Sequence, residues 1–432
     1  MAEARVALVT TAWTGCDETG CDEAAFLVRR VAAALAMEAE VTVVLASGHR
    51  GATLECADGA FRVLRVESRP PQRRRADMLE AAIAAGAGPR MPAGTPPPVP
   101  PPLPSPVPSP VPSPVRAELR RLRGGSAAVP GLLRSLAPDV VVVAEHRHEL
   151  AALRAGEVTG CRRAALLPLA VDDLSLRLSL ADGVGDGWDA ICATNAFEAD
   201  LLRSSLGPDA PVHNLGVALE LPLGEGGSGV GGSGVGGEIE PASGLVVLDD
   251  PERRPGLYPI CLAPEVAHLG LRFPALTMAV VRPRDSVIVR GRSRRVEGPV
   301  DRAALWRLVA GAAATLDLRP TRLLAREVLE SLLLSTPVVV PATSGSARRH
   351  VQDANGGLWY RSPEELAACV QRVRSADLRS ALGAQGRRWA AATHGDEESF
   401  VRATRLAVLG GSAPTGAGLR APEQESRDRD HE

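Results

Sequence analysis

Strand-like and helix-like patterns of apolar residues alternate along this chain in two separate series. In the first series, short aliphatic runs predict strands, and apolar residues at three- and four-residue spacing predict helices. The predicted strands are 5–11, 41–47, 61–68, 139–143, 165–171, 189–194 and 212–217, and the predicted helices include 24–37, 76–85 and 116–123. Strands that alternate with helices in this way favour a parallel sheet covered by helices.

A second series begins at about Leu245 and shows the same alternation. Its predicted strands are 256–263, 286–291, 314–318, 336–342 and 356–360, with helices between and after them. Two such series predict two domains, which we place at 1–220 and 244–410. The expected fold class is therefore α/β, with two doubly wound, Rossmann-like sheets that face a cleft and hold ligands at the ends of their strands.

Three segments lack a pattern that would bury a core. The range 89–115 is dense in proline, which predicts a polyproline II or disordered insertion in the first domain. The range 221–243 is a glycine-rich linker, in which the G-x-G-x-x-G that begins at Gly227 arises from a repeated GGSGV. The polar range 411–432 is predicted to be a disordered tail.

Composition limits the chemistry. The 432 residues are 45% apolar and 23% charged, as in globular domains, and a net charge of −2 gives no reason to expect a nucleic-acid partner. Lysine does not occur, so all 49 basic residues are arginine, which excludes Schiff-base and P-loop lysine chemistry. The seven cysteines form no C-x-x-C pair and favour a reduced, cytoplasmic setting.

The sequence predicts neither a metal site nor a membrane span. It has no H-E-x-x-H, no cluster of cysteine and histidine, and no D-x-D placed between a strand and a loop. No apolar run reaches the roughly 18 residues that cross a bilayer, and 1–12 lacks the basic start of a signal peptide. Arginine clusters at 73–75 and 116–123 are either solvated faces or points of peripheral contact with anionic lipid.

The stretch 322–360 carries the most specific motif. A helix with Glu330 leads into Ser335-Thr336-Pro337-Val338-Val339, then into Ser344-Gly345-Ser346 and Asn355-Gly356-Gly357-Leu358. In this order and spacing the segments resemble the donor-binding half of glycosyltransferase family 4. The resemblance implies a GT-B fold and a metal-independent enzyme that uses a nucleotide-sugar as substrate and needs no further cofactor.

The resemblance also implies how the donor is held. Glu330 falls where the family places a carboxylate that accepts hydrogen bonds from the ribose hydroxyls, so we expect it to face the cleft; the alternative is a solvated helix residue. Backbone N–H groups at Ser344, Gly345 and Ser346 lie near a helix start, where an anionic diphosphate is favoured. On this view, replacing Glu330 with glutamine weakens donor binding and leaves stability nearly unchanged.

The same stretch departs from the family pattern at two points. Arg322 occupies the position of a second glutamate that contacts the transferred sugar, and Glu327 is its candidate substitute. The arginine and lysine pair expected near 260–268 is missing. Arg322 and Arg326, with Arg290 as a third candidate, are therefore either the ligands of the diphosphate or surface arginines.

Two segments of the first domain match the family's acceptor side. Gly20 and Glu23 lie between the first strand and the first helix, where the family carries G-G-x-E, although Glu23 serves equally well to balance a helix dipole. Asp172 and Asp173 fall in a segment that resembles the family's P-x-x-H-D-E. The resemblance assigns these four residues to the acceptor or to the transferred sugar.

His146 and His148 follow the strand 139–143, at the edge where open α/β sheets hold ligands. The resemblance implies that they polarise the transferred sugar or the acceptor; otherwise they are solvated loop residues. The function expected is retaining transfer of a sugar to a sugar, lipid or small-molecule acceptor, in the cytoplasm or at a membrane surface. Two alternatives stay open, a catalytically weakened GT-B binding module and a sugar-nucleotide epimerase.

Overall fold

The computed structural model describes the chain in segments. These are residues 4–10, 23–47, 54–57, 61–67, 133, 135–144, 161, 163–168, 187–219, 244–250, 262–282, 285–319 and 324–410. The predicted proline-rich insertion, linker and tail, and the helices predicted at 76–85 and 116–123, lie outside these residues. Within the described segments, none of the helices is both long and apolar enough to cross a membrane.

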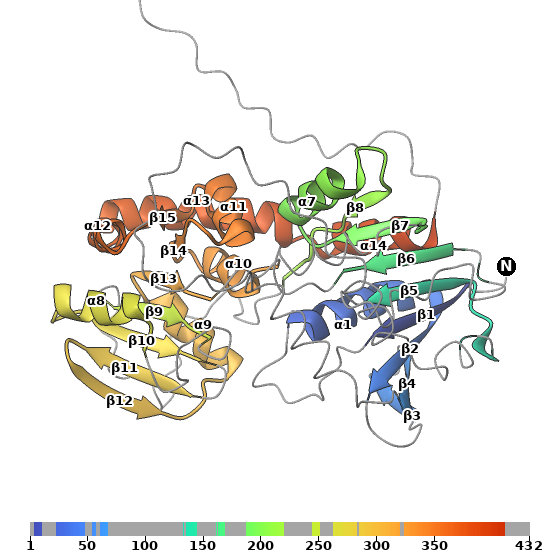
Figure 1. Ribbon diagram of the computed structural model, residues 1–432, viewed down its shortest axis with the longest axis horizontal. Helices are drawn as coiled ribbons and strands as arrows, with labels where there is room; N and C mark the ends of the chain where they lie inside the picture. Colours follow the sequence, from blue (N-terminus) through green and yellow to red (C-terminus); the bar gives the residue numbers. More distant parts are fainter. Residues whose placement is uncertain are drawn as a thin grey trace, which may run out of the picture.

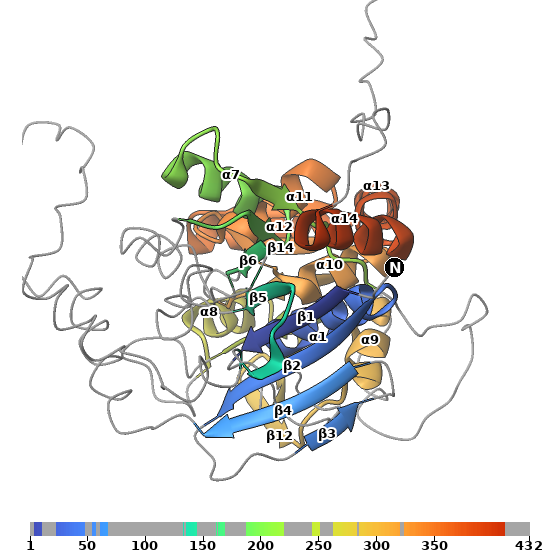
Figure 2. The ribbon, with the colours of Figure 1, turned by 90° about the vertical axis from the view of Figure 1, so that its right-hand side faces the viewer.

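The first lobe is built on an eight-stranded sheet in the order β3-β4-β2-β1-β5-β6-β7-β8. Its strands are β1 (Ala4–Thr10), β2 (Ala39–Ser47), β3 (Leu54–Ala57), β4 (Phe61–Glu67), β5 (Val140–Ala144), β6 (Arg163–Leu167), β7 (Ala190–Ala193) and β8 (Val212–Asn214). All neighbours are parallel except β3, which runs antiparallel to β4. Figure 2 shows β1, β2 and β4 fanning out with the twist of a parallel sheet.

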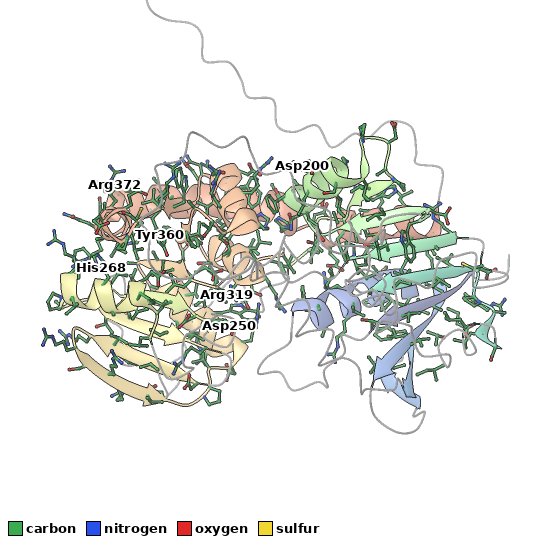
Figure 3. The ribbon with its side chains drawn as sticks, viewed as in Figure 1. Asp200, Asp250, His268, Arg319, Tyr360 and Arg372 are labelled. Carbon is green, nitrogen blue, oxygen red and sulfur yellow. The ribbon has the colours of Figure 1, made fainter. Side chains whose placement is uncertain are left out.

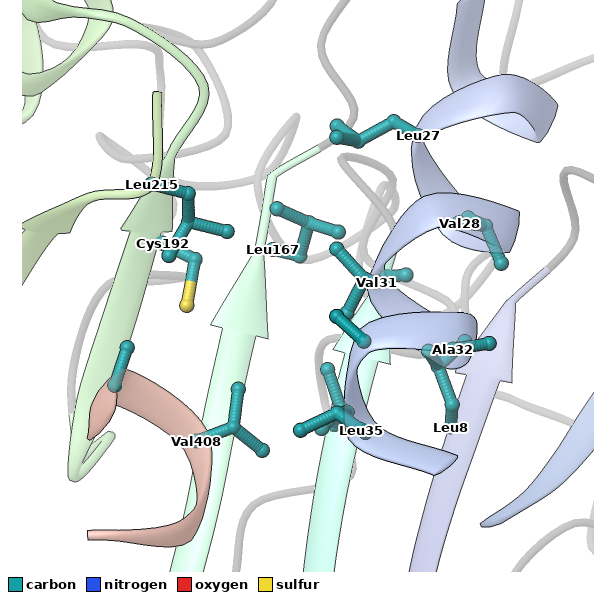
Figure 4. Packing of buried hydrophobic residues seen from close by; sticks show 14 of the residues in the cluster. Leu8, Leu27, Val28, Val31, Ala32, Leu35, Leu167, Cys192, Leu215 and Val408 are labelled. Atoms are coloured by element: carbon teal, nitrogen blue, oxygen red, sulfur yellow. The ribbon is translucent and has the colours of Figure 1, made fainter. Parts of the chain in front are cut away.

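One face of this sheet is covered by α1 (Glu23–Ala36) and by the last helix of the chain, α14 (Glu397–Leu409). Leu27, Val31 and Leu35 recur on one side of α1 and pack on Leu167 of β6, and Val408 of α14 joins the same cluster (Figure 4). The other face buries α7 (Ala196–Leu206). Helices on both faces explain why the strands are apolar along their length.

The second lobe holds a seven-stranded sheet in the order β12-β11-β10-β9-β13-β14-β15. Its strands are β9 (Leu245–Leu248), β10 (Thr277–Val281), β11 (Ser286–Arg290), β12 (Ser293–Glu297), β13 (Ala314–Asp317), β14 (Val338–Pro341) and β15 (Gly357–Tyr360). Its helices are α8 (Pro264–Arg272), α9 (Arg302–Gly311), α10 (Arg326–Leu333), α11 (Gly345–Ala354), α12 (Pro363–Val373) and α13 (Ala376–His394). The expected α/β class, with two doubly wound Rossmann-like sheets, is confirmed.

The start of the second sheet differs from the prediction. The first strand of this sheet that the structure describes is β9, upstream of the strand predicted at 256–263, of which 256–261 lie outside the described residues. Ala263 instead precedes α8, whose first residue is Pro264, a favoured residue at a helix start. The run 277–281, which was not predicted, forms β10 next to β9. The positions that follow the first strand are therefore Asp249 and Asp250, not 260–268.

The two lobes lie side by side, with α10 of the second lobe toward α1 of the first (Figure 1). The chain returns after α13, because α14 packs on the first sheet although it falls in the range predicted for the second domain. At this return, the backbone N–H of Leu219 donates to the carbonyl of His394 at 2.7 Å, and Nδ1 of His394 lies 3.0 Å from the carbonyl of Val217. The segment that ends at Leu219 and the end of α13 are thereby tied together.

Candidate functional site

The strongest concentration of buried charge in the second lobe surrounds α10, which follows the carboxyl end of β13. The helix begins after Ala325, a residue with a left-handed φ of 49°, and has no side-chain cap at that end. Val328, Leu329 and Leu332 are fully buried and fix the helix in the core. This packing turns Glu327 and Glu330, which are one turn apart, toward the start of α9.

Arg302, the first residue of α9, holds both glutamates. Its guanidinium pairs with Oε1 of Glu330, and its Nη1 lies 3.5 Å from Oε1 of Glu327. Arg326 adds a second arginine, with Nε donating to Oε1 of Glu330 at 2.9 Å. Burial lowers the pKa of Arg326, and the neighbouring Glu330 acts in the opposite direction. Oε1 of Glu330 therefore forms ion pairs with two guanidinium groups.

Arg319 extends this network to the edge of the sheet. Its Nε and Nη2 donate to the two carboxylate oxygens of Asp317, the last residue of β13, each at 2.8 Å. Its Nη1 donates to Oε2 of Glu327 at 2.7 Å. Asp250, which follows β9, is buried at the same edge, and Figure 3 shows Arg319 and Asp250 on the side of the lobe that faces the first lobe. This is where open α/β sheets bind ligands.

Glu330 is 2% exposed, and its two oxygens differ. Oε1 is held by Arg302 and Arg326, whereas Oε2 is buried and has no hydrogen-bond partner among the residues that the structure describes. A buried carboxylate oxygen without a donor is unfavourable unless a ligand supplies one. The alternative interpretation, a solvated helix residue, is thus wrong, and the predicted role of Glu330 at the donor ribose stays a prediction.

Arg326 also joins α10 to the first lobe. Its guanidinium carbon lies 3.6 Å from the ring centroid of Phe26 on α1, a cation–π contact. Leu324 and Leu329 belong to the apolar cluster of the first lobe, together with Leu27. The helix that carries Glu330 is therefore packed between the lobes.

The predicted phosphate-binding turn does precede a helix. Ser344 is the residue before α11, and its side chain makes no capping bond. Gly345 faces α7 of the first lobe so closely that a Cβ on it would lie 2.5 Å from Cζ of Phe197. Oγ of Ser346 lies 3.3 Å from Nε2 of His350, which is itself 3.3 Å from the carbonyl of Leu324. The turn and the start of α10 are thus linked.

His350 stands in a buried aromatic group behind this turn. Its ring centroid is 5.7 Å from those of Trp389 and His394, and those two are 5.4 Å apart. Burial lowers the pKa of His350 to about 3 and also lowers that of His394. Both rings are therefore neutral at physiological pH and act as packing groups rather than as charges.

Several predicted site residues are not tested. Gly20, His146, His148, Asp172, Asp173 and Arg322 lie outside the described residues. Glu23 begins α1, in keeping with its predicted place at the helix start. Of the predicted donor-side residues, the structure brings Arg326, Glu327 and Glu330 into one cluster and connects Ser346 to it through His350. Their roles stay predictions.

Arg290 does not lie at this edge. It ends β11, which runs antiparallel to β10, and it is paired with Thr277 at the beginning of β10. Since β10 is parallel to β9, the start of β10 lies at the opposite edge of the sheet from Asp249 and Asp317. The interpretation of Arg290 as a diphosphate ligand is therefore wrong.

Several buried or half-buried charged residues were missed at the sequence level, among them Arg302, Asp317, Arg319 and Glu198. Arg302 pairs with residues of a separate helix, and Asp317 and Arg319 pair with each other at a two-residue spacing that matches no motif. Glu198, the third residue of α7, is fully buried and accepts hydrogen bonds from N and Oγ1 of Thr194 at 2.7 and 2.6 Å. Burial raises its pKa to about 7. Its signal was Asn195 three residues earlier, a pattern typical of a helix start.

Across the described segments, no group of three histidine, cysteine or acidic residues has the geometry of a metal site. Asp317 is instead neutralised by Arg319, and Glu330 by Arg302 and Arg326. Arginine is thus the cation at this edge of the second sheet, with a planar fork of donors suited to carboxylate or phosphate.

Comparison with known proteins identifies the architecture. No family model matches the sequence. No curated protein matches it either. Solved structures do match: a sucrose-phosphate synthase from Thermosynechococcus elongatus is 12% identical, with a TM-score of 0.59, and the match covers 93% of this chain and 98% of that one.

Two further structures match over similar lengths. WaaG, described as a glycosyltransferase involved in lipopolysaccharide biosynthesis, is 14% identical with a TM-score of 0.55, covering 94% of this chain and all of that one. HepE from Anabaena in complex with UDP-glucose is 12% identical with a TM-score of 0.51, covering 93% and 98%. The two facing Rossmann-like lobes are thus those of a GT-B fold.

Proposed function

We propose that this chain is a glycosyltransferase that moves a sugar, with retention of configuration, from a nucleotide-activated donor to a sugar, lipid or small-molecule acceptor. The GT-B fold supports this, since the solved structures that it resembles include a named glycosyltransferase, WaaG, and a protein bound to UDP-glucose, HepE. Fold alone does not fix function, so the proposal must rest on the residues of the site.

The observation that carries the proposal is Oε2 of Glu330. This oxygen lacks a hydrogen-bond donor among the described residues, at the helix position where family 4 enzymes hold the donor ribose. Ribose hydroxyls would supply the missing donors, and charge-assisted hydrogen bonds to a carboxylate are strong. Arg302 and Arg326 both pair with Oε1 of Glu330. They thereby fix the orientation of the carboxylate, and Oε2 stays available to the ribose hydroxyls.

The proposed mechanism is electrostatic. Arg326 and the N–H groups at the start of α11 bind the donor diphosphate, and they stabilise the charge that develops on it as the bond to the sugar breaks. The acceptor hydroxyl attacks from the same face, with His146 or His148 as the group that polarises it. No covalent intermediate with the protein is involved, and no metal is required.

Donor binding tests the role of Glu330. Calorimetric titration with UDP-glucose should show an affinity about ten- to a hundredfold lower for Glu330→Gln than for the wild type. Glu327→Gln is the matched control on the same helix, because both oxygens of Glu327 already face arginines, and it should lose less. Unchanged affinity in Glu330→Gln, at a temperature where the variant is folded, refutes the assignment.

Turnover tests the reaction class. Release of UDP from UDP-glucose, measured with and without sugar acceptors and in the presence of EDTA, should reveal metal-independent transfer or slow hydrolysis. Conversion of the donor sugar without UDP release would instead indicate the epimerase. Binding without any turnover, across a panel of nucleotide sugars, would indicate the weakened binding module.

A further inference from the structure

Arg290, which lies away from the Glu330 cluster, belongs to a separate surface on the hairpin of β11 and β12. β11 and β12 form a hairpin joined by Gly291 and Arg292, and β12 is the last strand in the order of the second sheet. In the described part of the chain, no strand pairs with the outer side of β12. We call the hairpin segment 290–296 the basic edge.

The basic edge is strongly cationic. All four of its arginines are exposed, namely Arg290, Arg292, Arg294 and Arg295. The acidic residue nearest in sequence is Glu297, whose carboxylate lies 2.6 Å from the guanidinium of Arg295. A local excess of positive charge on a chain whose net charge is −2 indicates an acidic partner rather than general solubility.

The hydrogen bonding of the hairpin determines which backbone groups are available. A two-residue turn makes Arg290 and Ser293 a pair that exchanges both ladder hydrogen bonds, and such pairs alternate along an antiparallel ladder. Ser293, Arg295 and Glu297 therefore bond to β11. The N–H and C=O groups of Arg294 and Val296 point to the outer side.

Side chains flank this free edge on both faces. Arg294 and Val296 project from one face and Arg295 from the other, because successive residues of a strand alternate. Val296 is 69% exposed, which is unusual for a large apolar side chain on a strand of arginines. Next to the edge lies a groove of about 400 Å³, lined by Thr277, Ile288, Arg290, Ser293, Arg294 and Arg295.

We propose that the basic edge binds an extended acidic peptide segment of a partner protein, which adds to the sheet as a further strand beside β12. The outward backbone groups of Arg294 and Val296 would pair with the peptide main chain. Acidic side chains on both faces of the peptide would meet Arg294 and Arg295, and an apolar one would cover Val296.

A peptide fits these features better than a bilayer. The outward N–H groups need hydrogen-bond acceptors in register, which a peptide strand supplies and a lipid surface does not. The turn of the basic edge lies at the opposite end of the strands from the Glu330 cluster, and three strands separate β12 from β13, so the peptide would bind without entering the donor site. The inference therefore goes beyond the proposed transfer reaction and does not depend on it.

The test uses the full-length protein and a fluorescein-labelled decapeptide of alternating glutamate and valine, read by fluorescence polarisation. The double variant Arg294→Ser/Arg295→Ser should bind at least about tenfold more weakly. Arg387→Ser/Arg388→Ser, an equally exposed arginine pair on α13, is the matched control and should bind like the wild type. An equal loss of peptide affinity in both double variants would show that only the net charge of the protein matters, and would overturn the proposal.

A second pair of variants tests strand addition itself. Val296→Pro removes an outward N–H but no bond to β11, and should weaken binding about tenfold, whereas Val296→Ala should change it about twofold or less. Equal affinities of Val296→Pro and Val296→Ala would overturn strand addition. Binding to phosphatidylserine vesicles that needs the arginines but ignores Val296→Pro, together with no peptide binding, would assign the surface to a membrane instead.

Discussion

Among the described residues, each lobe buries one glutamate close to the carboxyl edge of its sheet, and the two are stabilised by different means. Glu330 on α10 is 2% exposed and its Oε1 faces two arginines. Glu198 on α7 is fully buried, and the bonds to its Oε2 come from the neutral groups of Thr194. The residue type and depth are the same, but the partners are not.

The partners decide what each carboxyl group can do. Around Glu330, the guanidinium groups of Arg302 and Arg326 offset part of the lost hydration, since opposite charges attract. The Glu198 carboxyl has only dipoles around Oε2, and burial raises its pKa to about 7. The second lobe thus holds its buried glutamate through ion pairs, whereas the first lobe holds a carboxyl group that is protonated over part of the physiological range.

Removing the charge of Glu330 should cause the largest loss of stability among the variants that test this difference between the two glutamates. Glu330→Gln leaves Arg302 and Arg326 without their shared counter-charge, and losing one partner of a buried pair costs about 3 kcal/mol. Chemical denaturation should show this loss, contrary to the sequence-based expectation of unchanged stability. Asp353→Asn, which breaks the exposed pair with Arg349, is the control and should cost less than about 1 kcal/mol.

Glu198→Gln tests the other side of the comparison. The folded wild type keeps its proton up to a pH of about 7, while the unfolded chain loses it near the ordinary value of 4.5, so stability falls as pH rises between these values. The variant does not titrate there. Its unfolding free energy relative to wild type should therefore increase by about 3 kcal/mol from pH 4 to pH 8. A pH-independent difference would contradict the raised pKa.

Gly345→Ala tests the contact between α11 of the second lobe and α7, the helix of the first lobe that carries Glu198. Its Cβ would lie 2.5 Å from the ring of Phe197, which precedes Glu198 on α7, so the ring or the two helices must shift. Overpacking of this kind costs about 1–2 kcal/mol. The double variant Gly345→Ala/Phe197→Ala relieves the clash and should cost less than the sum of the two single variants, as measured by thermal unfolding.

The sequence predicts the strands and helices of this molecule better than the partners of its buried charges. Strands such as 5–11 and 139–143 are apolar throughout because both faces are covered, so they were found nearly to the residue. β9 was missed because only four residues form it and an equally apolar run follows at 256–263. Strand length and turn signals did not separate these two candidates.

Of the two arginines that pair with Glu330, sequence spacing indicates one and not the other. Arg326 lies four residues before it, and that spacing indicates a pair on one helix. Arg302 lies 28 residues away on another helix, and only the order of β13 and β9 in the sheet brings it near. Neither pattern nor family resemblance predicts such a partner, so burial of the carboxylate could not be foreseen.

The contact of Arg326 with Phe26 provides the finest test, because it joins the charged cluster of the second lobe to α1 of the first. The ring is 3.6 Å from a guanidinium that also serves Glu330, so the stack helps to hold Arg326 in place. Phe26→Leu keeps an apolar side chain and removes the π face, and should cost about 0.5–1 kcal/mol beyond the change in size. A double-mutant cycle with Arg326→Met isolates this coupling in unfolding experiments. A coupling energy near zero would show that the lobes meet at Phe26 without the stack contributing, and that the arginine is positioned by Glu330 alone.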